Sequence, residues 1–160
     1  MKKPIVAAQL YTLRDFLKET AELPKTFAKV KKIGYDYAQI SGLTAEVAPA
    51  DLRKIMLDQG VEPIGAHVSL EAWRNNFKES IETIHGYGVK YAAIPWLSWA
   101  KYKEFSPAEW KKLFREFDTI AKKAAKEGII VQYHNHDFEF NQFGIKNGKG
   151  GQTILEMMFD

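Results

Sequence analysis

The side chains best suited to chemistry lie together near the end of the chain, between Tyr133 and Phe140. His134 and His136 are two positions apart, so on an extended strand their imidazoles face the same side, about 7 Å apart along it. Two imidazoles with a nearby carboxylate, here Glu139, are donors that suit Mn²⁺, Zn²⁺ or Fe²⁺. The sequence therefore predicts metal ligation by His134 and His136. The alternative is that these imidazoles only bind substrate hydroxyls.

A short apolar strand must position these residues. Residues 129–133 form an apolar run that Gly128 opens after a long helical pattern, and such a run is typical of a buried parallel strand. Ligands bind at the C-terminal ends of the strands in α/β sheets and barrels. The chemistry of this chain is therefore expected where this strand ends.

The same unit recurs along the chain: an amphipathic helix, a glycine, a short apolar strand and a polar residue at the end of that strand. Expected strands cover residues 5–11, 37–41, 62–67, 91–96 and 129–133, and expected helices cover residues 20–32, 49–60, 76–85 and 106–127, with the beginning of another in 151–158. Strands that alternate with helices predict βαβ units and a parallel sheet. The fold class expected for a single domain of residues 1–160 is therefore α/β.

Side-chain parity favours a barrel over an open sheet, because alternate residues of each barrel strand point inward. Polar side chains share one parity at the ends of four of the five expected strands: Gln9 and Tyr11, Gln39 and Ser41, His67, and His134 and His136. The mouth of a barrel requires such polar ends, whereas an open sheet covered by helices does not. We therefore expect an incomplete parallel (β/α) barrel with about five of the eight units of a TIM barrel.

Four residues of this polar face suit the binding of a polyol, namely Gln9, Tyr11, Gln39 and His67. His67 could also transfer protons as an acid or base, because an imidazole titrates near neutral pH. The alternative is that His67 is a histidine satisfied by its neighbours inside the barrel. Each of the four is weak evidence when taken alone.

Two further residues are candidates for binding a substrate. Trp96 follows the fourth expected strand, where its ring could stack on the apolar face of a sugar or cover the rim of the barrel. Asn135 lies between the two neighbouring histidines, where its amide could bind substrate or hold the local structure. The sequence alone leaves both alternatives open.

Three segments carry a resemblance to a known family: Gln9-Leu10-Tyr11-Thr12-Leu13-Arg14-Asp15, Gly34-Tyr35, and Tyr133-His134-Asn135-His136-Asp137-Phe138-Glu139-Phe140. Together they resemble the sugar phosphate isomerase/epimerase family, which shares the xylose-isomerase-like TIM barrel with endonuclease IV. The resemblance covers essentially the whole chain, in order.

The resemblance implies a small-molecule sugar substrate and an isomerase or epimerase reaction by metal-assisted proton transfer. It implies a divalent metal (Mn, Zn, Mg or Fe) held by His134 and His136. It also implies that His67 and Glu139 are catalytic.

The chain departs from this family in two ways. Family members are complete eight-stranded barrels, and a TIM barrel needs roughly 250 residues, whereas these 160 residues offer five strands. In addition, His134-Asn135-His136 stands where many relatives have Glu-Asn-His. The alternative to an enzyme is therefore a non-catalytic half-barrel that self-associates, because unpaired strand edges and apolar patches invite association.

Composition narrows the partners and the compartment. The 23 Lys and Arg residues against 20 Asp and Glu give a formal charge of +3, and the basic residues are scattered along helices, so no nucleic-acid partner is expected. There is no cysteine, which excludes disulfides and thiolate chemistry. The apolar stretch near the start ends at Gln9 and is too short for a signal peptide or a membrane span. A cytoplasmic location with no membrane partner is therefore expected.

Overall fold

A computed structural model describes residues 4–143 and 151–160. Its centre is a parallel sheet of five strands in the order β1-β2-β3-β4-β5, so each strand pairs with the next one along the chain. The strands are β1 (Ala7–Gln9), β2 (Tyr37–Ile40), β3 (Glu62–His67), β4 (Tyr91–Ile94) and β5 (Ile130–Tyr133). This consecutive order is that of a TIM barrel, and the expected fold class of an incomplete parallel (β/α) barrel is confirmed.

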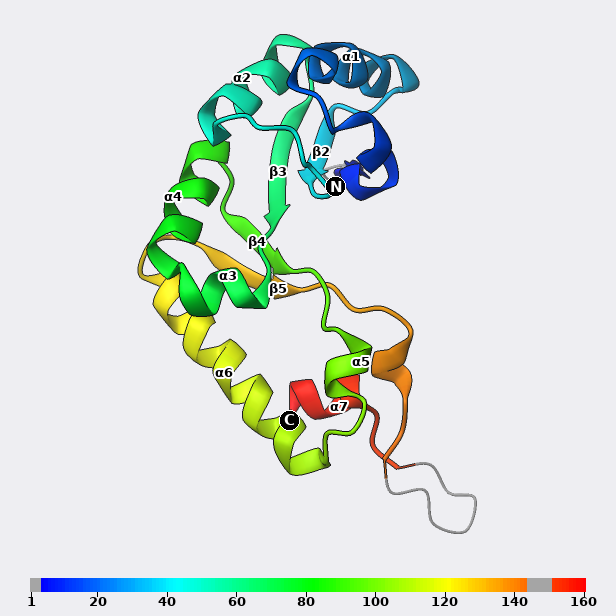
Figure 1. Cartoon of the computed structure of the whole chain (residues 1–160), viewed down its shortest axis with the longest axis vertical. Helices are drawn as coiled ribbons and strands as arrows, with labels where there is room; N and C mark the ends of the chain where they lie inside the picture. Colours follow the sequence, from blue (N-terminus) through cyan, green and yellow to red (C-terminus); the bar gives the residue numbers. More distant parts are fainter. Residues whose placement is uncertain (1–3, 144–150) are drawn as a thin grey trace.

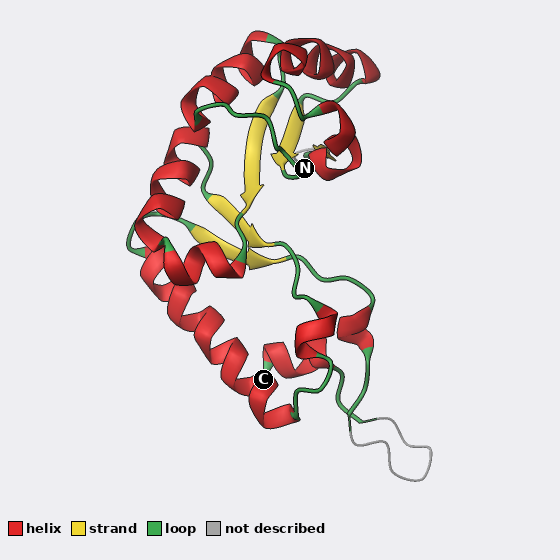
Figure 2. Cartoon of the chain, in the orientation of Figure 1, coloured by secondary structure: helices red, strands yellow, loops and turns green. Residues whose placement is uncertain are grey.

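Four longer helices cover one side of the sheet and leave the other side open (Figures 1 and 2). They are α1 (Leu23–Ile33), α2 (Pro49–Asp58), α4 (Phe77–Tyr87) and α6 (Pro107–Ala125). Shorter helical pieces complete the chain, namely η1 (Leu10–Phe16), η2 (Thr20–Glu22), α3 (Leu70–Asn75), α5 (Trp99–Tyr102), η3 (Phe138–Phe140) and α7 (Ile154–Phe159). The helices form the outer, convex side of a crescent, and the strands form its inner side.

Amphipathic helices and glycine stops build this layer as the sequence predicts. Helix α1 buries Phe27 and Val30 against the sheet and ends at Gly34. Gly34 has a φ of 116°, a conformation that glycine adopts without a steric penalty. Helix α6 buries Trp110 and Phe117 on one face, and burying each large aromatic side chain contributes about 2–3 kcal/mol.

The structure also corrects several expected boundaries. The first strand is predicted over residues 5–11, but it ends at Gln9 and the chain turns into the 3₁₀ helix η1. The backbone N–H of Tyr11 then donates to the hydroxyl of Ser41 at 2.9 Å, so this N–H is bonded across the sheet edge. Helix α3 was not expected at all, although Ser69 caps its start by accepting a hydrogen bond from the Ala72 N–H.

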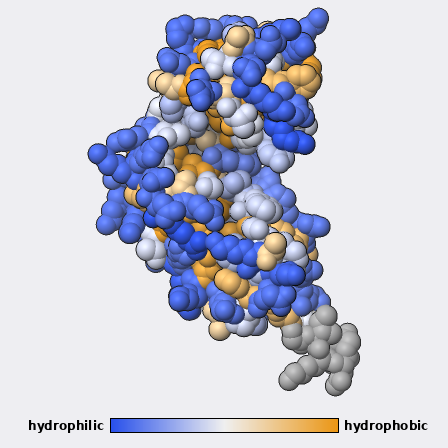
Figure 3. Space-filling model, viewed as in Figure 1, coloured by the Kyte–Doolittle hydropathy of each residue, from blue (hydrophilic) through white to orange (hydrophobic). Residues whose placement is uncertain are grey.

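The open side of the sheet is hollowed and exposes part of its apolar surface (Figure 3). In the described part of the chain, β1 and β5 each pair on one side only. Ile130 on β5 is 48% exposed, and Val6 just before β1 is 67% exposed. Both edges of the sheet therefore carry unpaired backbone groups beside accessible apolar side chains.

The capping box of α6 allows a direct test of how much one helix cap contributes to the stability of the fold. The Ser106 hydroxyl accepts a hydrogen bond from the Glu109 N–H, and the Glu109 carboxylate accepts from the Ser106 N–H. We expect Ser106→Ala to lower the free energy of unfolding by about 1 kcal/mol, because it removes this cap. Ser98→Ala is the matched control, since Ser98 precedes α5 without a side-chain cap. Urea denaturation measures both variants, and equal losses would contradict the assignment.

Candidate active site

Three predicted residues from three different strands meet on the open side of the sheet. The Gln9 amide nitrogen, at the end of β1, donates to the Gln39 amide oxygen on β2 at 2.5 Å. The same nitrogen lies 3.4 Å from Nε2 of His67, at the end of β3. Strand pairing places Gln9 opposite Gln39 and Gln39 opposite Gly65. The shared parity in the sequence thus corresponds to a continuous polar row in space.

Gly65 and a bulge in β3 shape this row. Ala38 pairs with Pro63 and Gln39 pairs with Gly65, so one extra residue of β3 is inserted between them. A Cβ atom at Gly65 would lie 3.2 Å from the Tyr91 carbonyl oxygen and 3.8 Å from the Gln39 amide nitrogen. The tight approach is to the Tyr91 carbonyl on β4, so glycine at this position allows β3 and β4 to come close beside the Gln39 amide.

Ser41 orients the Gln9 amide and was missed as a site residue. It is buried, and its hydroxyl donates to the Gln9 amide oxygen while accepting from the Tyr11 N–H. With its oxygen engaged in this way, the Gln9 amide must turn its nitrogen toward Gln39 and His67. The sequence did carry a signal for Ser41, because it has the same parity as Gln39.

Three imidazoles continue the polar row toward β5. The rings of His67 and His134 are 5.0 Å apart between centroids and meet edge to face, and those of His134 and His136 are 4.9 Å apart. His67 pairs in register with Ala93 on β4, and Ala93 pairs with Gln132 on β5. Ala93 thus lies in register between His67 and Gln132, and its side chain is a methyl group.

Burial and neighbouring imidazoles lower the pKa of two of these rings, His67 and His134. Burial is the largest cause that lowers the pKa of His67 from its ordinary value of 6.5 to about 4, followed by the neighbouring His134 and His136. Burial and His136 also lower the pKa of His134, and the carboxylate of Glu139 opposes this shift. At neutral pH His67 is thus unprotonated, so its ring can accept a hydrogen bond.

Glu139 is turned inward, away from a role as an open base or ligand. Its side chain is fully buried, and its two oxygens accept hydrogen bonds from the Tyr133 hydroxyl and, at 2.8 Å, from the His136 N–H. Burial, and then the bond to Glu139, raises the pKa of Tyr133 well above its ordinary value. This geometry fits a positioning role for Glu139 better than the catalytic role that the sequence predicts.

The remaining predicted residues lie outside the polar row. Tyr11 is 55% exposed, with the Arg14 guanidinium 4.7 Å from its ring centroid. Trp96 is 53% exposed in the segment after β4. Asn135 donates to the His136 carbonyl at 3.2 Å. None of the three contributes to the contacts that join Gln9, Gln39 and the imidazoles.

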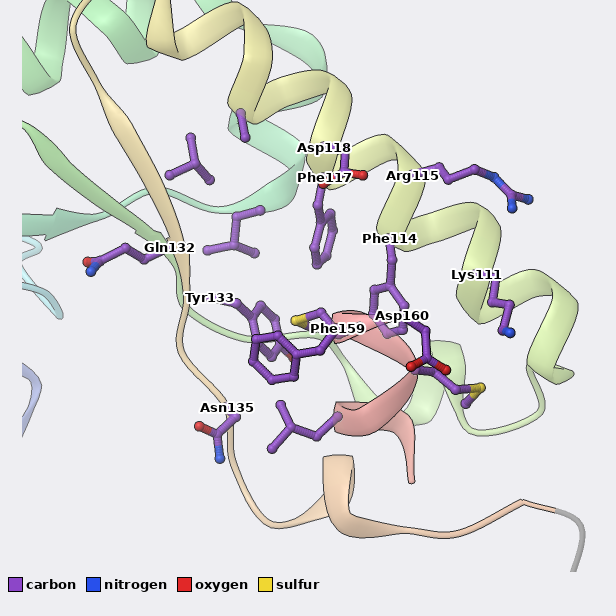
Figure 4. A pocket seen from close by; sticks show the side chains of 16 residues that line it. Lys111, Phe114, Arg115, Phe117, Asp118, Gln132, Tyr133, Asn135, Phe159 and Asp160 are labelled. Atoms are coloured by element: carbon purple, nitrogen blue, oxygen red, sulfur yellow. The ribbon is translucent and has the colours of Figure 1, made fainter. Parts of the chain in front are cut away.

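Two hollows flank β5 and differ in chemistry. A cavity of about 300 Å³ on the inner face is lined by the amides of Gln9, Gln39 and Gln132 and by less polar residues of β1, β3 and β4. A larger cavity of about 660 Å³ lies between β5, α6 and α7, where Phe114, Phe117 and Asn135 line it (Figure 4). The smaller hollow is the better candidate for polar chemistry, because the Gln9 and Gln39 amides line it and the Gln9 amide nitrogen lies 3.4 Å from His67.

The donors do not form a complete metal site within the described residues. No three side chains of His, Cys, Asp or Glu in residues 4–143 and 151–160 are grouped so that they could hold a metal ion. His134 and His136 are neighbours, but both oxygens of Glu139 are already bonded inside the protein. Two imidazoles alone do not fit the three or four protein ligands of a typical catalytic metal.

Across residues 4–143 and 151–160, every helix is too short or too polar to cross a bilayer.

No family model matches the sequence, and no curated protein matches it. Solved structures do. A sugar phosphate isomerase/epimerase from Parabacteroides distasonis matches with a TM-score of 0.77 and 21% identity, over 99% of this chain and 62% of its own. A xylose isomerase domain containing protein from Salmonella typhimurium LT2 matches with a TM-score of 0.60 and 11% identity, over 82% and 51%. An L-ribulose 3-epimerase matches with a TM-score of 0.60 and 14% identity, over 81% and 48%.

These similarities define the fold as part of a xylose-isomerase-like TIM barrel, and they confirm the resemblance seen in the sequence at the level of the fold. The chain spans about three fifths of the length of the Parabacteroides distasonis protein and about half of the other two. It is therefore a partial barrel, with five of the strands that a complete barrel contains.

The low pKa of His67 predicts how stability depends on pH. Between about pH 4 and 6.5 the unfolded chain binds a proton at His67 that the folded chain does not. Proton binding therefore stabilises the unfolded state relative to the folded state as the pH falls through this window, and the free energy of unfolding decreases. We expect the melting temperature of the parent to fall more steeply from pH 6.5 to 4 than that of His67→Gln. His85→Gln, which changes a histidine at the end of α4, should keep the parental slope. Equal slopes in the parent and His67→Gln would contradict the assignment.

Proposed function

We propose that this chain forms the polyol-binding wall of a barrel that isomerises or epimerises a sugar by proton transfer. The observation that supports this most is the junction of Gln9, Gln39 and His67, which brings two amides and a neutral imidazole together at the ends of three strands. Amides both donate and accept hydrogen bonds, so they match the hydroxyl groups of a sugar.

The three imidazoles supply groups that can move a proton. Isomerisation and epimerisation both remove a proton from a carbon next to a carbonyl group. Isomerisation returns a proton to the neighbouring carbon, and epimerisation returns it to the opposite face of the same carbon. His67 is unprotonated at neutral pH, which is the form that accepts a proton from a substrate. His134 and His136 extend the same row, so a sugar lying along it would meet several acceptors.

This chain would provide only part of the ligand set of a divalent metal. His134 and His136 would provide two of its donors, and other residues would have to complete the set. A bound metal would polarise the sugar carbonyl as a Lewis acid. We assign the binding of hydroxyls and the first proton acceptor to this chain's own amides and imidazoles.

Exchange of carbon-bound hydrogen for solvent deuterium tests the proposed chemistry. Ketopentoses and ketohexoses, with and without a terminal phosphate, are incubated in D₂O with and without Mn²⁺ and followed by NMR. We expect deuterium to enter beside the carbonyl of at least one sugar, with the rate in His67→Gln reduced roughly a hundredfold, as for loss of a general base. His85→Gln is the matched control, because its ring bonds the Glu127 carbonyl outside the site.

The same assay distinguishes metal-dependent exchange from direct proton transfer by His67. Exchange that requires Mn²⁺ and disappears in the His134→Ala/His136→Ala variant would support these imidazoles as metal ligands. Exchange without Mn²⁺ would support direct proton transfer by His67. No exchange with any sugar would contradict the proposed activity of this chain.

A second proposal concerns association between copies of the chain. In the described residues β1 and β5 are free edges of one all-parallel sheet. Around a two-fold axis along the strands, β5 of one copy can pair in parallel with β1 of a second copy, and the reverse pair forms at the same time. Exposed Ile130 and Val6 lie at these two edges, so this pairing would cover apolar surface as well as backbone groups. We propose a second copy as the occupant of these edges.

Sedimentation velocity over a range of concentrations tests this association. We expect a dimer that forms as the concentration rises and that Ile130→Lys weakens at least tenfold, because a charge would be placed at the paired edge. Ile33→Lys is the control, since Ile33 is 73% exposed and lies at the end of α1, outside the two edge strands. A parent that stays monomeric at high concentration would refute the proposal.

A further inference from the structure

Glu139 occupies an unusual place for a carboxylate. In residues 4–143 and 151–160 it is the one charged side chain that is fully buried. Both groups that bond it, the Tyr133 hydroxyl and the His136 N–H, are uncharged. Burying a carboxylate costs free energy unless its oxygens are well bonded. The presence of a buried carboxylate, despite this cost, is explained if its hydrogen bonds hold part of the site in place.

The two bonds join a rigid part of the fold to the segment that carries the histidines. Tyr133 stacks on Phe117 of α6, with ring centroids 5.8 Å apart, and so belongs to the packed layer between β5 and that helix. Glu139 lies in η3, six residues further along the chain. The hydrogen bond from the Tyr133 hydroxyl to its carboxylate therefore joins the two ends of the loop 133–139. Tyr133 in turn connects this loop to α6.

Within this loop the His136 backbone is the point that Glu139 fixes. The His136 ring lies nearly parallel to the Phe138 ring, at 7° and 6.2 Å between centroids. Phe138 in turn packs on Trp99 of α5 at 5.3 Å. The backbone bond and the ring contact hold His136 from two sides, so its imidazole keeps its place 4.9 Å from His134.

The choice of a carboxylate follows from the groups it must satisfy. A phenol O–H and a backbone N–H are both donors, and a carboxylate offers an acceptor oxygen to each. A glutamine would offer one oxygen and one NH₂ group. It could still accept from the His136 N–H, but the Tyr133 hydroxyl would have to turn and accept from the amide. An apolar side chain of similar length would leave both donors without a partner.

We propose that Glu139 is a positioning residue that holds His136, and through it the row of three imidazoles, in place for the substrate. This inference rests on the proposed function for the meaning of the row, but the placement of His136 is a property of the protein alone. Glu139 acts through the backbone of its neighbour and does not itself touch the sugar.

Three substitutions separate this role from simple stabilisation. Glu139→Met removes both acceptors at similar volume, Glu139→Gln restores the acceptor for His136, and Tyr133→Phe removes the bond to the helix layer while leaving the bond to His136. Tyr87→Phe is the matched control for Tyr133→Phe, because Tyr87 is a half-buried tyrosine at the end of α4, away from the loop. All variants are made in the full chain.

The main readout is the NMR spectrum of the four imidazoles, in which His85 serves as an internal reference. We expect Glu139→Met to shift or broaden the signals of His134 and His136 while that of His85 stays in place. Glu139→Gln should return them close to their parental positions. Tyr133→Phe should move them less than Glu139→Met, and Tyr87→Phe should leave them unchanged.

The deuterium-exchange assay adds a kinetic readout that stability alone would not change. We expect kcat for Glu139→Met to fall roughly tenfold or more, because small displacements of reacting groups are costly, with recovery in Glu139→Gln. Parental imidazole signals in Glu139→Met would overturn the proposal. If that variant does not fold, equal imidazole shifts in Tyr133→Phe and Tyr87→Phe, or none in either, would overturn it. If the parent shows no exchange, the proposed function fails while the imidazole signals still decide the role of Glu139.

Discussion

Parallel pairing of consecutive strands is the constraint on which every part of this site depends. The backbone bonds set Gln9 beside Gln39 and His67 beside Ala93, so side chains far apart in the sequence become neighbours across the sheet. The helices stabilise this arrangement from outside by packing against one face of the sheet, which buries residues of β2, β3 and β4 and partly covers β1 and β5. The other face, left open in the described residues, collects the polar ends. Neither the hydrogen bonds between amides nor the contacts between imidazoles would exist without that register.

Much of the fold could be predicted because its signals are local. The glycine after a helix, exemplified by Gly34, depends on a few neighbouring residues and on the allowed backbone angles. The period of two along a strand is equally local, and it identified Gln9, Gln39 and His67 as members of one face. The alternation of helices and strands then supplied the order of pairing. These three rules together were enough to bring the polar row into one place.

The rest depends on contacts that the sequence does not reveal. The end of β1 depends on a hydroxyl just after β2, since Ser41 bonds the Tyr11 N–H that a longer strand would have used. The roles of Glu139 could not be separated either. Residue type shows that a carboxylate can act as a base, a ligand or a brace, but only the packing of η3 shows that its oxygens are already bonded. Exposure of Tyr11 and Trp96 is likewise set by their surroundings.

The fourth strand had looked like the exception, because no polar residue marks its inner end. Its alanine at position 93 lies between His67 on one side and Gln132 on the other. A methyl group there adds little bulk between the polar side chains of the two flanking strands. A larger residue at position 93 would therefore change the spacing of polar groups on both neighbouring strands, although this position has no hydrogen-bonding side chain of its own.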